Sequence, residues 1–144
     1  MQIRQMTIDD YEVIYQLWHS TPGIGLNTTD DSREGIAKYL GRNPTTCFVC
    51  ENGGEIVGAI MSGHDGRRGY IHHTVVKESE RGSGIGSRLV DAVLSALKNE
   101  GINKVALTAF SRNESGNAFW EKCGFTARED LTYRNKEIVE LEYL

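Results

Sequence analysis

The sequence predicts one α/β (α+β) domain over residues 1–144, with a mixed, mostly antiparallel β-sheet and helices on both of its faces. Three observations lead to this fold class. Segments with strand-like and helical apolar spacing alternate, a hairpin signal marks an early antiparallel pair, and the last third of the chain alternates strand with helix. The expected order is β-α-α-β-β-β-α-β-α-β-β.

The first third of the chain is expected to contain one strand and two helices. Residues 3–6 have the pattern of a short strand, and Thr7–Asp10 is typical of a capping box that opens a helix over residues 9–19. A loop rich in glycine, threonine and asparagine occupies residues 20–31. A second, shorter helix then ends near Asn43.

The middle third is expected to form antiparallel strands. Thr45–Glu51 and Glu55–Gly63 are joined at Asn52-Gly53-Gly54, which is a tight-turn signal of the hairpin kind. A second glycine-containing turn over residues 65–69 leads into a strand over Tyr70–Val76. Consecutive strands with such short connections pair antiparallel.

The last third begins with the clearest helix of the chain. Leu89, Leu97 and the apolar residues between them lie on one helical face, and Gly101 is placed to end the helix. Lys104–Ala109 is then expected to be a strand and Ser115–Cys123 a short helix that stops at a glycine. From Phe125 to Tyr143 the pattern predicts a closing pair of strands.

The composition excludes several classes of function. Sixteen basic and twenty acidic side chains give a net charge of −4, which does not favour nucleic acid or an anionic membrane as a partner. The N-terminal residues lack the apolar core of a signal peptide, and no window has the ~18 apolar residues of a membrane span. We therefore expect a soluble, cytoplasmic protein.

Three cysteines cannot all pair within one chain, which also favours a reducing compartment. Cys47 and Cys50 have the spacing of a redox pair but lie in an apolar, strand-like run. Residues three apart on a strand point to opposite faces, so we expect both thiols to be small buried hydrophobic groups.

The glycine-rich turn Arg81-Gly82-Ser83-Gly84-Ile85-Gly86 lies between a predicted strand and the clearest helix. Backbone N–H groups and the helix N-terminus meet there, which predicts an anion site, most naturally for a phosphate. A P-loop is excluded because no Gly-Lys-Ser or Gly-Lys-Thr occurs. A dinucleotide fingerprint is excluded because Ser87 stands where the third glycine belongs.

This turn, with the strand that ends at Val75-Val76, resembles the acetyl-CoA-binding motif R/Q-x-x-G-x-G/A of the GCN5-related N-acetyltransferase (GNAT) superfamily. About thirty residues later, Asn113 and the segment Ala118–Phe125 resemble the family's second signature, a helix ending in Y-E-x-x-G-F. The order of elements is similar from end to end, as in small single-domain bacterial members. The resemblance implies a sheet that splays open between the strands at 70–76 and 104–109.

The resemblance also implies that acetyl-CoA is the co-substrate and that no metal takes part. Val75 and Val76 would contact the pantetheine arm, and Asn113 would reach it from the opposite wall. Main-chain N–H groups in Thr74–Val76 would include the oxyanion donor. The pyrophosphate would be held by Arg81, Gly82, Gly84, Gly86 and Ser87.

Acetyl transfer to an amine requires the amine to be neutral, although an aliphatic ammonium has a pKa of about 10. The family's base positions match Tyr70 and His72, and His72, with an ordinary pKa near 6.5, is the better general base. Strand alternation predicts two faces, one with Tyr70, His72, Thr74 and Val76 and the other with Ile71, His73 and Val75. The alternative is that both histidines are partly buried polar residues of a sheet.

The second signature departs from the family pattern because Trp120 occupies the position of the acid tyrosine. An indole N–H cannot plausibly protonate a thiolate. Solvent would then supply the proton, or Tyr15, Tyr39 or Tyr133 would replace the missing tyrosine. Trp120 itself is then expected to be either a wall residue beside the thioester or an ordinary core residue.

The predicted function is that of an N-acetyltransferase (EC 2.3.1 type) that moves an acetyl group directly from coenzyme A to a primary amine. The acceptor is a small amine, an amino acid or a protein N-terminus, because family membership does not determine it. Its pocket would be built by residues 18–39 and 131–136, and a homodimer is compatible with the sequence. The alternative function is a non-catalytic acyl-CoA-binding or sensing module.

Overall fold

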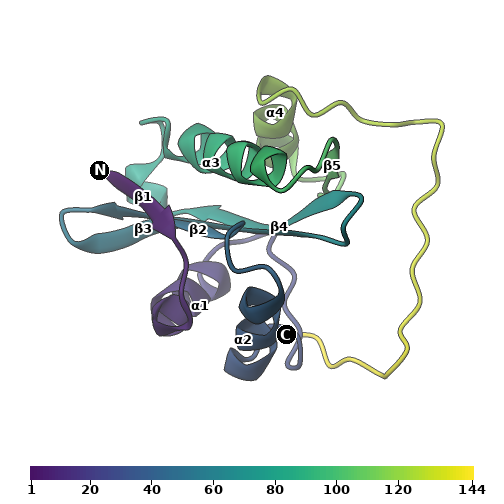
Figure 1. Cartoon of the computed structure of the whole chain (residues 1–144), viewed down its shortest axis with the longest axis horizontal. Helices are drawn as coiled ribbons and strands as arrows, with labels where there is room; N and C mark the ends of the chain where they lie inside the picture. Colours follow the sequence, from purple (N-terminus) through teal and green to yellow (C-terminus); the bar gives the residue numbers. More distant parts are fainter.

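The computed structural model describes residues 1–144 and contains one five-stranded sheet in the order β1-β2-β3-β4-β5. All neighbouring strands are antiparallel except β4 and β5, which are parallel. Helices α1 and α2 cover one face of the sheet and α3 and α4 lie over the other (Figure 1). The predicted fold class, a mixed sheet with helices on both faces, is confirmed.

The N-terminal elements agree with the sequence-based expectation. β1 is Gln2–Gln5, and the 3-10 turn η1 (Ile8–Asp10) leads directly into α1 (Tyr11–His19). The main-chain N–H of Thr7 donates to Asp10 Oδ2 at 2.9 Å, so the carboxylate satisfies a donor at the helix start. α2 is Arg33–Arg42, and the side chain of its N-cap residue Ser32 accepts from the following turn.

The central antiparallel strands are β2 (Phe48–Asn52), β3 (Glu55–His64) and β4 (Gly69–Val76). β2 and β3 are joined at Gly53 and Gly54, whose φ angles are +62° and +80°. Positive φ at both central residues is the requirement of the tight turn that matches the twist of a hairpin. The hairpin predicted from Asn52-Gly53-Gly54 is confirmed.

The later elements are the 3-10 turn η2 (Glu78–Glu80), α3 (Ile85–Asn99), β5 (Val105–Ala106) and α4 (Glu114–Lys122). α3 buries its apolar face against the sheet, and Leu89 is completely buried there. β5 has two residues where the sequence predicted six. Its length is limited by the pairing with β4, which covers only Gly69–Tyr70.

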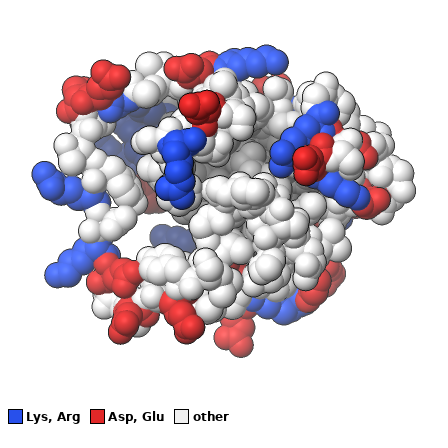
Figure 2. Space-filling view, turned by 180° about the vertical axis from the view of Figure 1, so that it is seen from behind, with Lys and Arg blue, Asp and Glu red and all other residues white.

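The prediction of two closing strands after Phe125 is wrong. The segment 126–142 runs away from the sheet as an extended trace, and the chain returns only at its end (Figure 1). Figure 2 shows open space at the left between this segment and the rest of the molecule. Most of its apolar side chains are exposed, Ile138 to 99%. A strand needs a partner edge for its backbone groups, and here only an isolated bridge between Asn27 and Tyr143 provides one.

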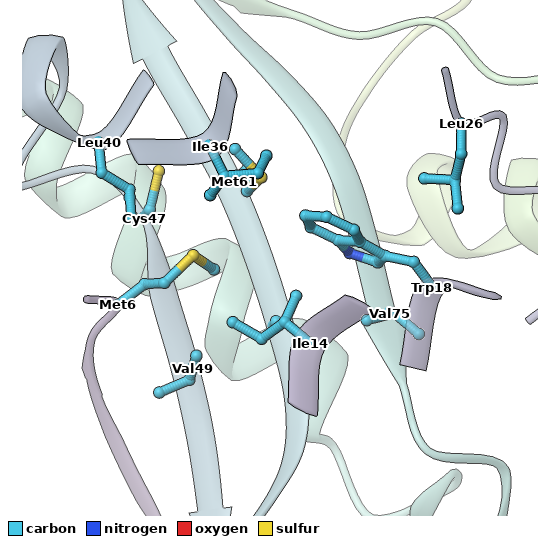
Figure 3. Packing of buried hydrophobic residues seen from close by; sticks show 11 residues of the cluster. Met6, Ile14, Trp18, Leu26, Ile36, Leu40, Cys47, Val49, Met61 and Val75 are labelled. Atoms are coloured by element: carbon cyan, nitrogen blue, oxygen red, sulfur yellow. The ribbon is translucent and has the colours of Figure 1, made fainter. Parts of the chain in front are cut away.

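The core has two layers, one on each face of the sheet. Figure 3 shows the layer under α1 and α2, where Trp18 and Ile14 pack with residues of the central strands. Cys47 belongs to this layer and Cys50 to the layer under α3, and both are completely buried. The prediction that the two thiols face opposite sides of the sheet as buried hydrophobic groups is confirmed.

None of the helices is long and apolar enough to cross a lipid bilayer. In Figure 2, basic and acidic side chains are interspersed over the visible face.

Candidate active site

The sheet is open along one edge of β4. β4 pairs with β5 only at Gly69–Val105 and Tyr70–Ala106, so the strand from Ile71 to Val76 has no partner on that side. The splayed sheet implied by the resemblance is therefore present. The opening leaves backbone donors and acceptors of β4 available to a ligand.

The register with β3 determines which backbone groups face this opening. The N–H of Lys77 donates to the carbonyl of Val57 at 2.7 Å, and bonded pairs alternate with unbonded pairs along an antiparallel ladder. Val75 therefore turns its N–H and C=O toward β3. Thr74 and Val76 turn theirs toward the open edge, where the Val76 carbonyl accepts from Arg81 Nε at 3.1 Å.

A β-bulge changes the side-chain pattern of β4. Ile60 pairs with Thr74 and Ser62 with Ile71, so His72 and His73 both stand opposite Met61. Ile71 packs in the layer under α3, whereas Val75 packs in the layer under α1 and α2. The prediction that strict alternation separates His72 from His73 is wrong, because the extra residue of the bulge resets the alternation.

Both histidines face the side of α1 and α2. The His72 ring lies 5.3 Å from the ring of Tyr39 and 4.7 Å from that of Tyr70, measured between centroids. The His73 ring lies 4.8 Å from Trp18, and its Nε2 is 2.7 Å from Asp31 Oδ1. The Tyr70 hydroxyl reaches across the opening to Thr108 Oγ1, 2.8 Å away.

His72 lies at a solvent-exposed rim but packs against aromatic rings. Desolvation by these neighbours lowers its pKa below the ordinary value of 6.5, and His73 lowers it further. The carboxylates of Asp31 and Asp30 act in the opposite direction without reversing the shift. The imidazole is therefore mainly neutral at neutral pH, with a lone pair available to accept a proton.

The glycine-rich turn connects the open edge to α3. Gly82 and Gly84 have φ angles of +87° and +86°, values that residues with a Cβ rarely adopt. Arg81, Gly82 and Gly84 are all exposed, and Gly84 is the N-cap of the 15-residue helix α3. The first N–H groups of α3 have no partner within the helix, so partial positive charge gathers at this turn.

Gly86 and Ser87 have roles in packing that spacing alone did not indicate. A Cβ on Gly86 would lie 3.0 Å from Phe119 Cε1, so the glycine lets α4 approach α3 closely. Ser87 lies beside Cys123, where burial raises the pKa of the thiol and the Ser87 hydroxyl lowers it in part. Both residues still belong to the first turn of α3, where their N–H groups can face an anion.

Asn113 and Trp120 lie on opposite ends of α4. The Asn113 side chain accepts from the N–H of Gly116 at 3.0 Å, and its Nδ2 is 3.4 Å from the place a Cβ of Gly23 would take. The start of α4 thus lies against the loop between α1 and α2. The Trp120 ring packs edge-on between Phe119 and Phe125, at 5.0 and 5.2 Å between centroids.

The sequence did not associate Tyr39, Asp31 or Thr108 with His72. Tyr39 was one of three equivalent replacements for the missing acid tyrosine, and only the structure places its ring beside His72. Tyr15 packs against His19, and Tyr133 lies on the exposed segment 126–142. Burial raises the pKa of Tyr39, so its hydroxyl keeps its proton at neutral pH.

Comparisons with known proteins give one consistent result. Residues 11–125 match the model of the acetyltransferase (GNAT) family. The chain is 32% identical over 145 residues to an acetyltransferase of Photorhabdus laumondii subsp. laumondii, across 99% of this chain and 100% of that protein.

The fold is similar to that of Ard1 from Thermoplasma volcanium, with a TM-score of 0.75 and 25% identity over 85% of this chain and 80% of that one. It is also similar to a Mycobacterium tuberculosis protein solved in complex with CoA and NLQ, with a TM-score of 0.65 and 20% identity over 83% and 70% of the two chains.

Proposed function

The chain belongs to the acetyltransferase (GNAT) family, and we propose that it transfers an acetyl group from acetyl-CoA directly to a primary amine. The observation that carries this proposal is the open edge of β4. It runs without a partner strand from His72 to the glycine-rich turn, so one strand connects a neutral base to an anion site.

The glycine-rich turn is suited to the pyrophosphate of coenzyme A. Gly82 and Gly84 let the backbone approach a phosphate closely, and the N-terminus of α3 contributes partial positive charge. The main-chain N–H groups of Gly86 and Ser87 would complete the cradle. Arg81 would add a full positive charge while its Nε remains bonded to the carbonyl of Val76.

The open edge of β4 is suited to the pantetheine arm, whose amides can bond to backbone groups as an added strand does. The available groups are those of Thr74 and Val76. Val75 would contribute by holding the strand in place, because its polar groups face β3 and its side chain is buried. Asn113, with its amide turned to the loop at Gly23, would close the opposite wall.

His72 would act as the general base, directly or through one water. It removes a proton from the ammonium of the acceptor, and the neutral nitrogen then attacks the thioester carbon. A main-chain N–H on the open edge, that of Thr74 or Val76, stabilises the oxyanion of the tetrahedral intermediate. Collapse of the intermediate breaks the carbon–sulfur bond, the nitrogen loses its second proton to solvent, and the products are the amide and the thiolate of coenzyme A.

The proton for the thiolate would come from solvent or from Tyr39. Trp120 is held among Phe119 and Phe125, and an indole N–H does not protonate a thiolate. Of the three candidate tyrosines, only Tyr39 has its ring beside His72, but its hydroxyl lies against Gly63 of β3, so solvent is the better placed donor. Tyr70 would help to hold the opening through its contact with Thr108.

A second candidate function is a sensing module that binds acyl-CoA without turning it over. The observation that favours it is Trp120, which stands where the family has its acid tyrosine. Both functions require the glycine-rich turn, so binding of coenzyme A does not separate them.

The deciding experiment measures release of the coenzyme A thiol from acetyl-CoA against a panel of amines, amino acids and N-terminal peptides, with coenzyme A binding recorded in parallel. Release that depends on one class of acceptor supports the transferase and identifies its substrate. Tight binding without release from any acceptor supports the sensing module. Absence of binding contradicts both.

A further inference from the structure

Asp31 is a buried carboxylate at the end of the loop between α1 and α2, and only 6% of its surface is exposed. Both of its oxygens are occupied. Oδ1 lies 2.7 Å from His73 Nε2, and Oδ2 accepts the main-chain N–H of Asn27 at 2.8 Å. Because an ionised carboxylate can only accept, Nε2 carries the proton and donates.

The loop that Asp31 closes, residues 20–32, is joined to several distant parts of the molecule. The hydroxyl of Tyr11 donates to the Asp31 carbonyl at 2.7 Å. Thr28 bonds to Glu142 at the end of the chain, and Gly23 lies against Asn113. The loop therefore spans from α1 to the start of α4, on the side of β4 that carries both histidines.

The bulge in β4 gives the Asp31–His73 bond its significance. His73 and His72 are adjacent on the same face, so a carboxylate that fixes His73 also restricts the backbone that carries His72. Trp18 packs edge-on against the His73 ring at 4.8 Å and limits its other movements. Because each oxygen of the Asp31 carboxylate accepts one bond, moving the loop away from His73 would leave Oδ1 without its partner.

We propose that Asp31 is a positioning residue of the transferase, an inference that rests on the proposed function. By accepting from His73, it holds the 20–32 loop against the β4 bulge and so fixes the distance between the acceptor amine and His72. It does not touch the reacting atoms. Its loss should therefore weaken use of the amine more than use of acetyl-CoA, whose proposed contacts are the backbone of Thr74 and Val76 and the glycine-rich turn.

The test compares Asp31→Asn with Asp10→Asn. Asp10 is a matched control because it is equally buried, at 6%, and its carboxylate also accepts from a side chain, Arg4 at 2.8 Å, but it belongs to the turn before α1 and has no bond to β4. Asparagine at position 31 cannot accept from both His73 and the Asn27 N–H, because one side of its amide is a donor. We expect Asp31→Asn to raise the KM for the amine by about tenfold or more, with a smaller change in the KM for acetyl-CoA.

Substitutions at His73 give a second readout. His73→Gln can still donate to Asp31 and should keep most of the activity, whereas His73→Leu removes the donor and should behave as Asp31→Asn does. Equal losses in the two His73 variants, or equal rises in KM for both substrates, would overturn the positioning role. An equal effect of Asp10→Asn would do the same.

Amide hydrogen exchange separates this proposal from the proposed function. In Asp31→Asn we expect faster exchange over residues 20–32 and 70–76 and no such change in Asp10→Asn. If the wild-type protein acetylates no amine, the proposed function fails, and exchange alone decides the role of Asp31. In that case, an exchange rate over residues 20–32 that is the same in Asp31→Asn as in the wild type would overturn the proposal that Asp31 holds this loop against β4.

Discussion

Replacing His72 by glutamine isolates the proton-accepting role of the imidazole. Glutamine has a similar length and keeps a polar side chain next to Tyr39 and Tyr70, but it cannot accept a proton at neutral pH. Loss of a general base typically lowers a rate by about 10²–10⁴-fold. Because His72 lies at an exposed rim where water can partly replace it, we expect about a hundredfold loss in kcat.

The pH dependence provides the more specific measurement. A histidine with its ordinary pKa of 6.5 is already about three quarters neutral at pH 7, and the His72 pKa is lower than that. In the wild type, kcat/KM should therefore rise with pH along a limb whose midpoint lies below pH 6.5. In His72→Gln this limb should disappear, and the rate should follow the neutral fraction of the amine up to about pH 10.

The assay is release of the coenzyme A thiol over a range of pH, with binding of coenzyme A measured separately. His64→Gln is the control, since His64 lies at the end of β3 near Glu100 and Gly66. Coenzyme A should bind to both variants as it does to the wild type. A kcat within threefold of the wild type, with the acid limb unchanged, would refute the assignment of His72 as base.

Three further predictions concern stability, measured by denaturant unfolding. Gly86→Ala should destabilise the protein by about 1–3 kcal/mol because its Cβ meets Phe119 at 3.0 Å, and an unchanged midpoint would contradict the close packing of α4 on α3. Leu89→Ala should remove about 2–5 kcal/mol from a fully buried site, whereas Leu94→Ala should have a smaller effect, because Leu94, predicted on the same apolar face, is 36% exposed in the structure. For Asp10, burial raises the carboxyl pKa but hydrogen bonds to the neighbouring guanidinium and the Thr7 N–H outweigh it, so the pKa is lowered below 3.8. Its stabilisation is present above pH 3.8 and is lost as the pH falls through the folded-state pKa, so Asp10→Asn should weaken the acid dependence of unfolding, and an identical dependence would contradict the bond.

Local sequence signals were sufficient for the elements whose causes are local. The two glycines at Gly53-Gly54 demand positive φ, and the strand order around them follows from that turn. The apolar stripe of α3 and the glycines before it likewise depend on residues within one turn of each other. These signals located the glycine-rich turn and the strand that leads to it, which together make up most of the candidate coenzyme A site.

Signals that depend on a partner were not sufficient. The alternating pattern near Ile138 is that of a strand. A strand forms only where a neighbouring strand edge pairs with its backbone, and this segment has only the isolated bridge between Tyr143 and Asn27. β5 ends after two residues because β4 turns away from it. The sequence indicated only the phosphate-binding role of Gly86. Its second role, which lets Phe119 of α4 approach α3 closely, became evident only from the packing of the two helices.

The sequence by itself determined the type of fold, the glycine-rich turn and the strand β4 that leads to it, because turn chemistry and the apolar periodicity of helices and strands are properties of neighbouring residues. The tertiary structure decided where the histidines of β4 lie and what they contact. A one-residue bulge opposite Met61 turned His73 to the same face as His72, and burial of Asp31 gave His73 a partner 42 residues away in the chain. No rule of sequence spacing predicts the contact between Asp31 and His73, because it arises from the register of two strands and the position of a loop packed over them.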